Sequence, residues 1–129
     1  MIPKMPHIMV VDDNQDILSA LTFILSRNAY RVSVRSRFDN FEQEMETLSP
    51  DLVLLDKSLG WADGCDLCRA IKANKKMSSI PVIMFSAYYK KREECLNAGA
   101  SEFMEKPFEM NALLSTIRSF SAPPCNQGV

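Results

Sequence analysis

Apolar and polar positions divide the chain into two kinds of segment that follow one another. Continuous apolar runs at residues 8–11, 52–55 and 80–85 have the length of buried strands, while residues 30–35 alternate between apolar and polar. A short apolar pair at 103–104 is a further candidate strand. After each of these, apolar residues recur at helical spacing, around residues 17–25, 41–48, 64–76, 89–97 and 113–120. The pattern therefore predicts strands and helices in strict alternation.

This alternation favours a single α/β domain with a parallel sheet, because parallel neighbours need a crossover that a helix supplies. Strands that are apolar on both faces belong in the middle of such a sheet, so the alternating strand at 30–35 belongs at an edge. We therefore expect a flavodoxin-like three-layer sandwich with strand order 2-1-3-4-5 and a crevice between strands 1 and 3. The domain is expected over residues 7–120, with loose tails at 1–6 and 121–129.

Charged and polar residues stand where the predicted strands end. Strand 1 is followed by Asp12 and Asp13, strand 3 by Asp56, strand 4 by Ser86 and strand 5 by Lys106. Ligands of such sheets bind at the carboxyl ends of the strands, so we expect these groups around one pocket. Neighbouring carboxylates repel one another unless a cation relieves them, and oxygen ligands select a hard ion such as Mg²⁺. Together the groups are the parts needed for phosphoryl transfer to an aspartate.

Several short stretches, taken in this order and spacing, resemble those of response regulator receiver domains. They are Val10–Asn14, Leu54–Asp56, Asp63-Gly64, Pro81–Ala87, Ala98–Ala100 and Phe103–Phe108. The resemblance extends from about His7 to Phe120, which is nearly the whole chain. It implies a two-component phosphorelay protein that accepts a phosphoryl group from a histidine kinase. Such a protein is a phosphoacceptor with self-dephosphorylation, and we do not expect an enzyme.

The resemblance implies roles for the matching positions around the pocket. Asp56 matches the phosphoacceptor. Asp12 and Asp13 match the acidic pair that binds Mg²⁺, together with Asp56 and the backbone carbonyl of Ser58. Lys106 matches the lysine that pairs with the phosphoryl group.

A second group of positions matches the family's conformational switch. Ser86 matches the Ser or Thr that turns toward the phosphoryl group, and Phe103 matches the aromatic residue that moves inward when this happens. The Lys106–Pro107 peptide bond matches one that is cis in the family. These matches imply a two-state surface, formed by helix 4, strand 5 and helix 5, that partners read.

The chain departs from the family pattern in the loop after Asp56, at the switch residue, and at Tyr88, which lies two residues after Ser86, where it could cover the acyl phosphate. The loop after Asp56 has Gly60-Trp61 where the family commonly has Pro-Gly. We therefore expect a less rigid loop, with the Trp61 ring lying on helix 3 or on the loop itself. The switch residue is Phe103 where tyrosine is common, and because Phe has no hydroxyl to hydrogen-bond when exposed, its inward position is expected to be favoured even without phosphate.

Composition narrows the other classes of function. The chain has 47% hydrophobic residues and a net charge of -1, which indicate a soluble globule with no general attraction to nucleic acid or anionic membranes. No membrane span and no secretory signal are predicted, so we expect a cytoplasmic protein. Cys65 and Cys68 form a single C-x-x-C, but the chain has one histidine and no second such pair. Free, packed thiols are therefore favoured over a redox or zinc site.

The resemblance also implies binding partners, and two other functions remain as alternatives. The phosphoryl donor is expected to be a histidine kinase or a phosphotransfer protein, and the output a downstream protein or an output domain that this sequence lacks. The chain is expected to be a monomer or a phosphorylation-dependent dimer. One alternative is a receiver-like interaction module that never uses phosphate. The other is a small phosphatase of the haloacid-dehalogenase type, which would need Asp-x-Asp after strand 1 where this chain has adjacent Asp12 and Asp13.

Overall fold

The computed structural model describes residues 5–120, and the tails expected at 121–129 and over most of 1–6 lie outside this range. Strands and helices alternate along the described chain, as the apolar pattern predicts. In chain order they are β1 (His7–Val11), α1 (Gln15–Ser26), β2 (Arg31–Arg35), α2 (Phe41–Leu48), β3 (Leu52–Asp56), α3 (Gly64–Ala73), β4 (Val82–Ser86), the 3₁₀ turn η1 (Tyr89–Lys91), α4 (Arg92–Asn97), β5 (Glu102–Glu105) and α5 (Met110–Phe120).

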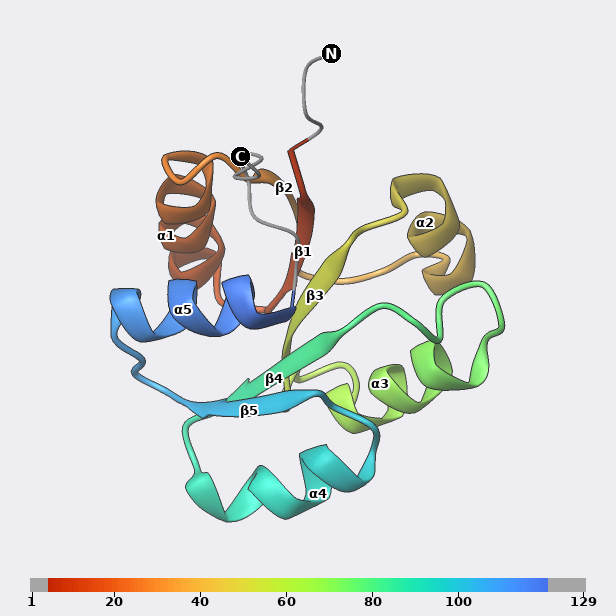
Figure 1. Ribbon diagram of the computed structural model, residues 1–129. Coiled ribbons are helices and arrows are strands. Elements are labelled where there is room, and N and C mark those ends of the chain that lie inside the picture. The colour runs from red at the N-terminus through yellow and green to blue at the C-terminus, as the bar shows by residue number, and fades with distance from the viewer. Residues whose placement is uncertain (1–4, 121–129) are drawn as a thin grey trace.

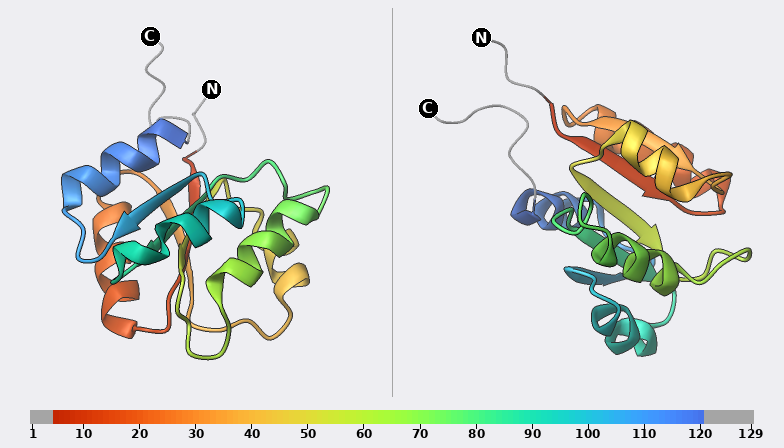
Figure 2. Two further views of the ribbon diagram at one scale, coloured as in Figure 1. Left: turned by 90° about the horizontal axis from the view of Figure 1, so that it is seen from below. Right: turned by 90° about the vertical axis from the view of Figure 1, so that its right-hand side faces the viewer.

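The strands form one parallel sheet in the order β2-β1-β3-β4-β5. This confirms the predicted fold class and strand order. Helices α1 and α5 cover one face of the sheet, and α2, α3 and α4 cover the other (Figures 1 and 2). Between β1 and β3 the direction of winding reverses, so the loops that follow these strands open at the predicted crevice.

Two apolar clusters fill the space between the sheet and its helices. Alternate residues of a strand point to opposite faces, so Met9 and Val11 pack toward α2, α3 and α4, while Ile8 and Val10 pack toward α1 and α5. The strands β1, β3 and β4 are buried along their whole length, whereas β2 at the edge is half-buried to exposed. This difference in burial is the physical reason that the continuous and the alternating runs identified the central and edge strands.

Several boundaries differ from the prediction: α3 ends at Ala73 rather than near 76, and α5 begins at Met110 rather than near 113. Strand β4 begins at Val82 because Ile80 closes a turn, its N–H donating to the carbonyl of Met77 over 2.9 Å. The helix expected at 89–97 is divided into η1 and α4, and neither begins with a side-chain cap. Pro6, assigned to the tail, is buried, and its carbonyl accepts a hydrogen bond from the N–H of Arg31 over 2.9 Å.

Within residues 5–120, each helix is too short or too polar to cross a membrane. Cys65, Cys68 and Cys95 are free and buried, and burial raises the pKa of Cys68 to about 11. Such thiols are protonated at neutral pH, so the C-x-x-C is part of the core rather than a reactive pair. Cys125 lies outside the described residues.

Candidate functional site

Three carboxylates meet where β1 and β3 end. Oxygen atoms of Asp12, Asp13 and Asp56 lie within 4.8 Å of one another. The two strands are neighbours with Val11 beside Leu55, so the residues that follow in each strand reach the same point of the sheet edge. Asp12 and Asp56 are buried and Asp13 is exposed. The cluster of three carboxylates is therefore held by two buried residues, Asp12 and Asp56, and is open to solvent at Asp13.

Lys106, at the end of the edge strand β5, brings a positive charge to these carboxylates. Its Nζ lies 2.9 Å from Oδ2 of Asp12 and 3.5 Å from Oδ1 of Asp56, and 5.0 Å from the centroid of the Phe85 ring. Its backbone N–H donates to the carbonyl of Ser86 over 2.7 Å, and the peptide bond to Pro107 is cis. Lys106 follows β5 directly, so the ends of β1, β3, β4 and β5 all contribute to one pocket.

The charges in the pocket do not balance. Burial, and then the charge of Asp12, raise the pKa of Asp56 from 3.8 to about 6, against the opposite effects of Lys106 and of a hydrogen bond from the backbone of Ser58. One ammonium, that of Lys106, pairs with two of the three carboxylates. The pKa of Asp56 stays raised because burial and the charge of Asp12 outweigh the effect of Lys106. An all-oxygen donor set with surplus negative charge and one open side fits Mg²⁺, which binds few carboxylates and keeps several waters.

Two glycines allow the β3–α3 loop to approach the pocket closely. At Gly64 a Cβ atom would lie 2.1 Å from the carbonyl oxygen of Asp56, so a larger residue would push against the end of β3. At Gly60 the φ angle is +78°, and a Cβ atom would lie 3.0 Å from Oδ2 of Asp13. A proline cannot adopt this φ angle. The loop therefore follows a different path from the one that the common Pro-Gly sequence would require.

Trp61 fixes the far side of this loop. Its Nε1 donates to the carbonyl of Ser36 over 2.8 Å, its ring packs edge-on against Phe38, and the Arg37 guanidinium lies 5.8 Å from the ring centroid. The ring was expected on helix 3 or on its own loop, and the structure adds contacts with the β2–α2 connection, where the indole N–H finds its acceptor. These contacts restrain a loop that was expected to lack rigidity.

The residues matched to the conformational switch lie beside the pocket. Ser86 is buried at the end of β4, and its Oγ accepts a hydrogen bond from the N–H of Tyr88 over 3.1 Å. Phe103 is 7% exposed, and its ring meets that of Tyr89 edge-on with centroids 6.2 Å apart. The ring of Phe103 is thus directed inward, while Tyr88 and Tyr89 are exposed.

A second charged cluster lies on the other side of Asp56, and the sequence analysis did not identify it. Lys57 is buried, and its Nζ lies 2.7 Å from Asp63 and 3.1 Å from Glu94. Burial alone would lower the pKa of Lys57, but the two hydrogen bonds outweigh it and raise the pKa above its ordinary value. Burial likewise fails to raise the pKa of Asp63, which the bonds from Lys57 and from the N–H of Cys65 lower. The sequence held one sign of this cluster: Lys57 directly follows a strand of buried residues, where a charged side chain needs a partner.

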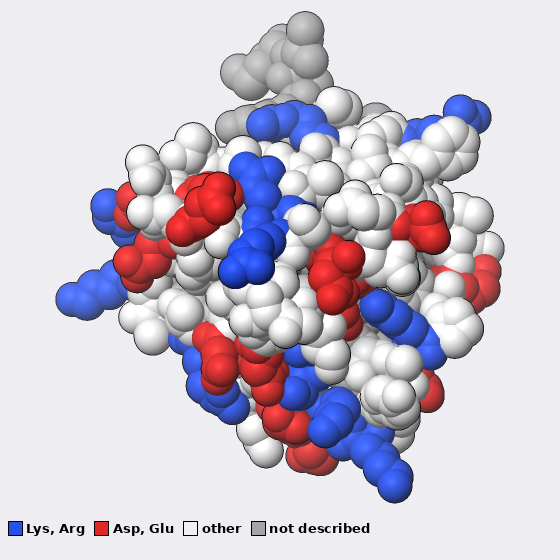
Figure 3. Space-filling view, turned by 180° about the vertical axis from the view of Figure 1, so that it is seen from behind, with Lys and Arg blue, Asp and Glu red and all other residues white. Residues whose placement is uncertain are grey.

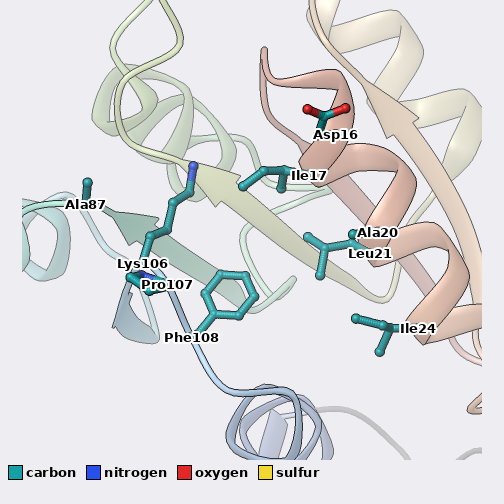
Figure 4. A pocket seen from close by; sticks show the side chains of 9 residues that line it. All are labelled: Asp16, Ile17, Ala20, Leu21, Ile24, Ala87, Lys106, Pro107 and Phe108. Carbon is teal, nitrogen blue, oxygen red and sulfur yellow. The ribbon is translucent and has the colours of Figure 1, made fainter.

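An apolar groove of about 470 Å³ opens beside Lys106, between α1 and the segment after β5. Ile17, Leu21 and Ile24 on α1 face Phe108 across this groove (Figure 4). The groove adjoins the acidic pocket, because Lys106 lines the groove and pairs with Asp56 in the pocket.

Comparisons with known proteins agree with this geometry. Residues 8–118 match the family of response regulator receiver domains. The chain is 34% identical over 127 residues to the alkaline phosphatase synthesis transcriptional regulatory protein PhoP of Bacillus subtilis, covering 93% of this chain and 52% of that protein. It therefore spans about half the length of this curated relative.

Solved structures show the same likeness. A response regulator receiver domain from Bermanella marisrubri superimposes with a TM-score of 0.82 at 29% identity, covering 91% of this chain and 98% of that one. The receiver domain of the sensor histidine kinase PA1611 from Pseudomonas aeruginosa, with a magnesium ion coordinated in its active-site cleft, gives 0.80 at 26% identity with the same coverage. The chain belongs to the response regulator receiver domain family.

Proposed function

We propose that Asp56 accepts a phosphoryl group from a histidine kinase or a phosphotransfer protein, and that Asp12, Asp13, Asp56 and the backbone carbonyl of Ser58 hold Mg²⁺ for this step. The observation that carries the proposal is the unbalanced group of three carboxylates with Lys106 at its edge. A nucleophile, a positive charge and an open side are present at one point of the sheet. When bound, Mg²⁺ would offset the charge on the phosphoryl oxygens.

The protein's own side chains then have distinct parts in the transfer. A carboxylate oxygen of Asp56 attacks the phosphorus, the bond from phosphorus to the donor breaks, and the donor keeps the electron pair. Lys106, which bridges Asp12 and Asp56, is near enough to exchange one of these contacts for a phosphoryl oxygen. Ser86 can donate its O–H to another oxygen while its Oγ still accepts from Tyr88.

The same residues supply the proposed switch. When the Ser86 hydroxyl turns toward the phosphoryl group, the packing around Phe103 and Tyr89 changes, because Tyr89 lies in the β4–α4 connection that follows Ser86 and its ring meets that of Phe103. The surface formed by α4, β5 and α5 is the one that we propose partners read. Hydrolysis of the acyl phosphate at the same site returns the chain to its first state without a separate phosphatase.

We propose that the phosphoryl donor docks over the apolar groove between α1 and Phe108, since a donor that reaches Asp56 must cover the mouth of the pocket that the groove adjoins. Ile17→Asp should slow phosphorylation by the cognate kinase about tenfold, because a charge would be buried under the donor, and should leave phosphorylation by acetyl phosphate unchanged. Equal effects on both donors would contradict this docking site.

We further propose that this domain is cytoplasmic, exists as a monomer or as a phosphorylation-dependent dimer, and does not itself bind nucleic acid. On the face shown in Figure 3, basic and acidic side chains are interspersed rather than gathered into a field of one sign. Its signal would pass to a downstream protein or to an output domain outside this sequence.

The decisive experiment is phosphorylation by acetyl phosphate with Mg²⁺, followed by intact mass measurement. The wild type should gain one phosphoryl group, and neither Asp56→Asn nor a sample with EDTA should gain any. A gain that persists in Asp56→Asn would place the phosphoacceptor elsewhere. No gain in the wild type from acetyl phosphate or from a kinase would contradict the proposal.

A further inference from the structure

The short helix α4 has few local means of holding its position. It has six residues, and Lys91 at its start makes no side-chain cap. Cys95 is its one fully buried residue. A helix this short is not stable by itself, so its place depends on contacts to the rest of the domain.

Lys57, the residue after the phosphoacceptor position, provides such a contact. Its ammonium bonds Asp63, which caps α3 through the N–H of Cys65, and it also bonds Glu94 of α4. A second contact runs in parallel, since Sγ of Cys65 donates to the backbone carbonyl of Glu94 over 3.7 Å. The start of α3 and the middle of α4 are thus joined through one buried lysine.

The backbone of Lys57 is fixed to the phosphoacceptor strand. Its N–H donates to the carbonyl of Phe85 over 2.9 Å, and its carbonyl accepts from the N–H of Gly64 over 2.7 Å. Lys57 follows Asp56 directly, and Gly64 closely approaches the Asp56 carbonyl. A shift of the peptide at Asp56 therefore displaces the base of the Lys57 side chain, and a shift of α4 pulls on its end.

We propose that Lys57 is a positioning residue that ties α4 to the phosphoacceptor strand and thereby holds the switch surface in its unphosphorylated arrangement. This inference rests on the proposed function, since it concerns the regulation of the same site. If the pair between Lys57 and Glu94 favours one of two arrangements, breaking it shifts the population toward the other and makes phosphorylation easier.

Glu94→Gln tests the tie, and Glu93→Gln is its matched control. Glu93 is next in the same helix, 80% exposed, and its nearest cation is Arg92 at 3.9 Å. We expect Glu94→Gln to speed amide hydrogen exchange in residues 92–97 of the unphosphorylated protein about threefold, and phosphorylation by acetyl phosphate by a similar factor. Glu93→Gln should change neither rate. Lys57→Met should act in the same direction, and the double variant should not exceed the larger single effect.

The outcomes separate this inference from the proposed function. If Glu94→Gln and Glu93→Gln exchange at the same rate, the tie does not exist. If exchange quickens and phosphorylation does not, α4 is tied but not coupled to Asp56, and the proposal is overturned. If the wild type accepts no phosphoryl group at all, the proposed function fails, and the exchange comparison alone decides whether Lys57 holds α4.

Discussion

Two acidic clusters lie on either side of the end of β3, and they differ in charge balance. The first contains Asp12, Asp13 and Asp56, of which Asp12 and Asp56 pair with the ammonium of Lys106, and burial raises the pKa of Asp56 to about 6. Asp63 and Glu94 also share one ammonium, that of Lys57, and the pKa of Asp63 is lowered. Similar side chains thus produce opposite shifts in neighbouring sites.

The comparison shows that the number of carboxylates per cation, and their burial, distinguish a candidate metal site from a structural ion pair. The second cluster contains two carboxylates, and the positive end of the α3 dipole lies against Asp63, so it needs no further cation. The first contains a third carboxylate, with Asp12 and Asp56 buried, and its surplus charge remains. A group of acidic ligands is therefore informative only together with the cations that already face it.

The largest expected effect comes from the residue between the two clusters. Gly64→Ala would place a Cβ atom 2.1 Å from the Asp56 carbonyl oxygen, so the end of β3 or the start of α3 must move. We expect a loss of about 3 kcal/mol in the free energy of unfolding, measured with urea, and a lower yield of phosphorylation. Ala70→Ser, an exposed change in the same helix, should stay within about 0.5 kcal/mol of wild type. A fully stable Gly64→Ala protein would show that the backbone at the end of β3 can move to accept the added methyl group.

Burial of Asp56 beside the charge of Asp12 should make the free energy of unfolding depend on pH. Because the pKa of Asp56 is raised from 3.8 to about 6, its ionised form is less favourable in the folded than in the unfolded chain. As the pH rises from about 4 to 6, the unfolded chain loses this proton first, and the folded state loses up to about 2 kcal/mol of relative stability.

Asp56→Asn removes this pH-dependent loss. In EDTA we expect the variant to be more stable than wild type at pH 7 and equally stable near pH 4, as measured by urea unfolding across this range. The difference at pH 7 should shrink when Mg²⁺ is added. Parallel stability curves for the two proteins would mean that the pKa of Asp56 is not raised in the folded chain.

The two clusters should also differ in their response to a metal. Asp13→Asn should weaken Mg²⁺ binding at least about tenfold, or about 1.4 kcal/mol. Asp63→Asn keeps a capping side chain and should change the affinity less than about twofold. Titration of the fluorescence of Trp61, the one tryptophan, reports binding, because Trp61 follows Gly60, which lies against Asp13. Equal losses in both variants would remove the distinction between the clusters.

The smallest expected effect concerns the open side of the first cluster. Tyr88 is 66% exposed and lies two residues after Ser86. Without its ring, water should reach the acyl phosphate more easily, and Tyr88→Ala should shorten the phosphoryl half-life about threefold. Phe23→Ala removes an equally exposed ring from α1 and should have no effect. An unchanged half-life in Tyr88→Ala would show that Tyr88 does not cover the site.

Much of the acidic pocket could be predicted because it follows from strand ends. Runs apolar on both faces identified the central strands, and adjacent parallel strands deliver Asp12, Asp13 and Asp56 to one edge whatever the loops do. The partners of Trp61 and Lys57 could not be predicted in this way, because they do not lie at the ends of neighbouring strands. Ser36 lies 25 residues before Trp61, and Glu94 lies in a helix that the sequence analysis made longer and more regular than it is.

By itself, the sequence determined the strand order and the residues that converge at the crevice. The reason is that burial on one or both faces of a strand leaves a periodic signature in the chain. Only the tertiary structure decided which carboxylates have cations and which do not, because ion pairs such as that of Lys57 and Glu94 join residues with no periodic relation. Charge balance depends on distances in space, and it is this balance that distinguishes the proposed metal site from the tie beside it.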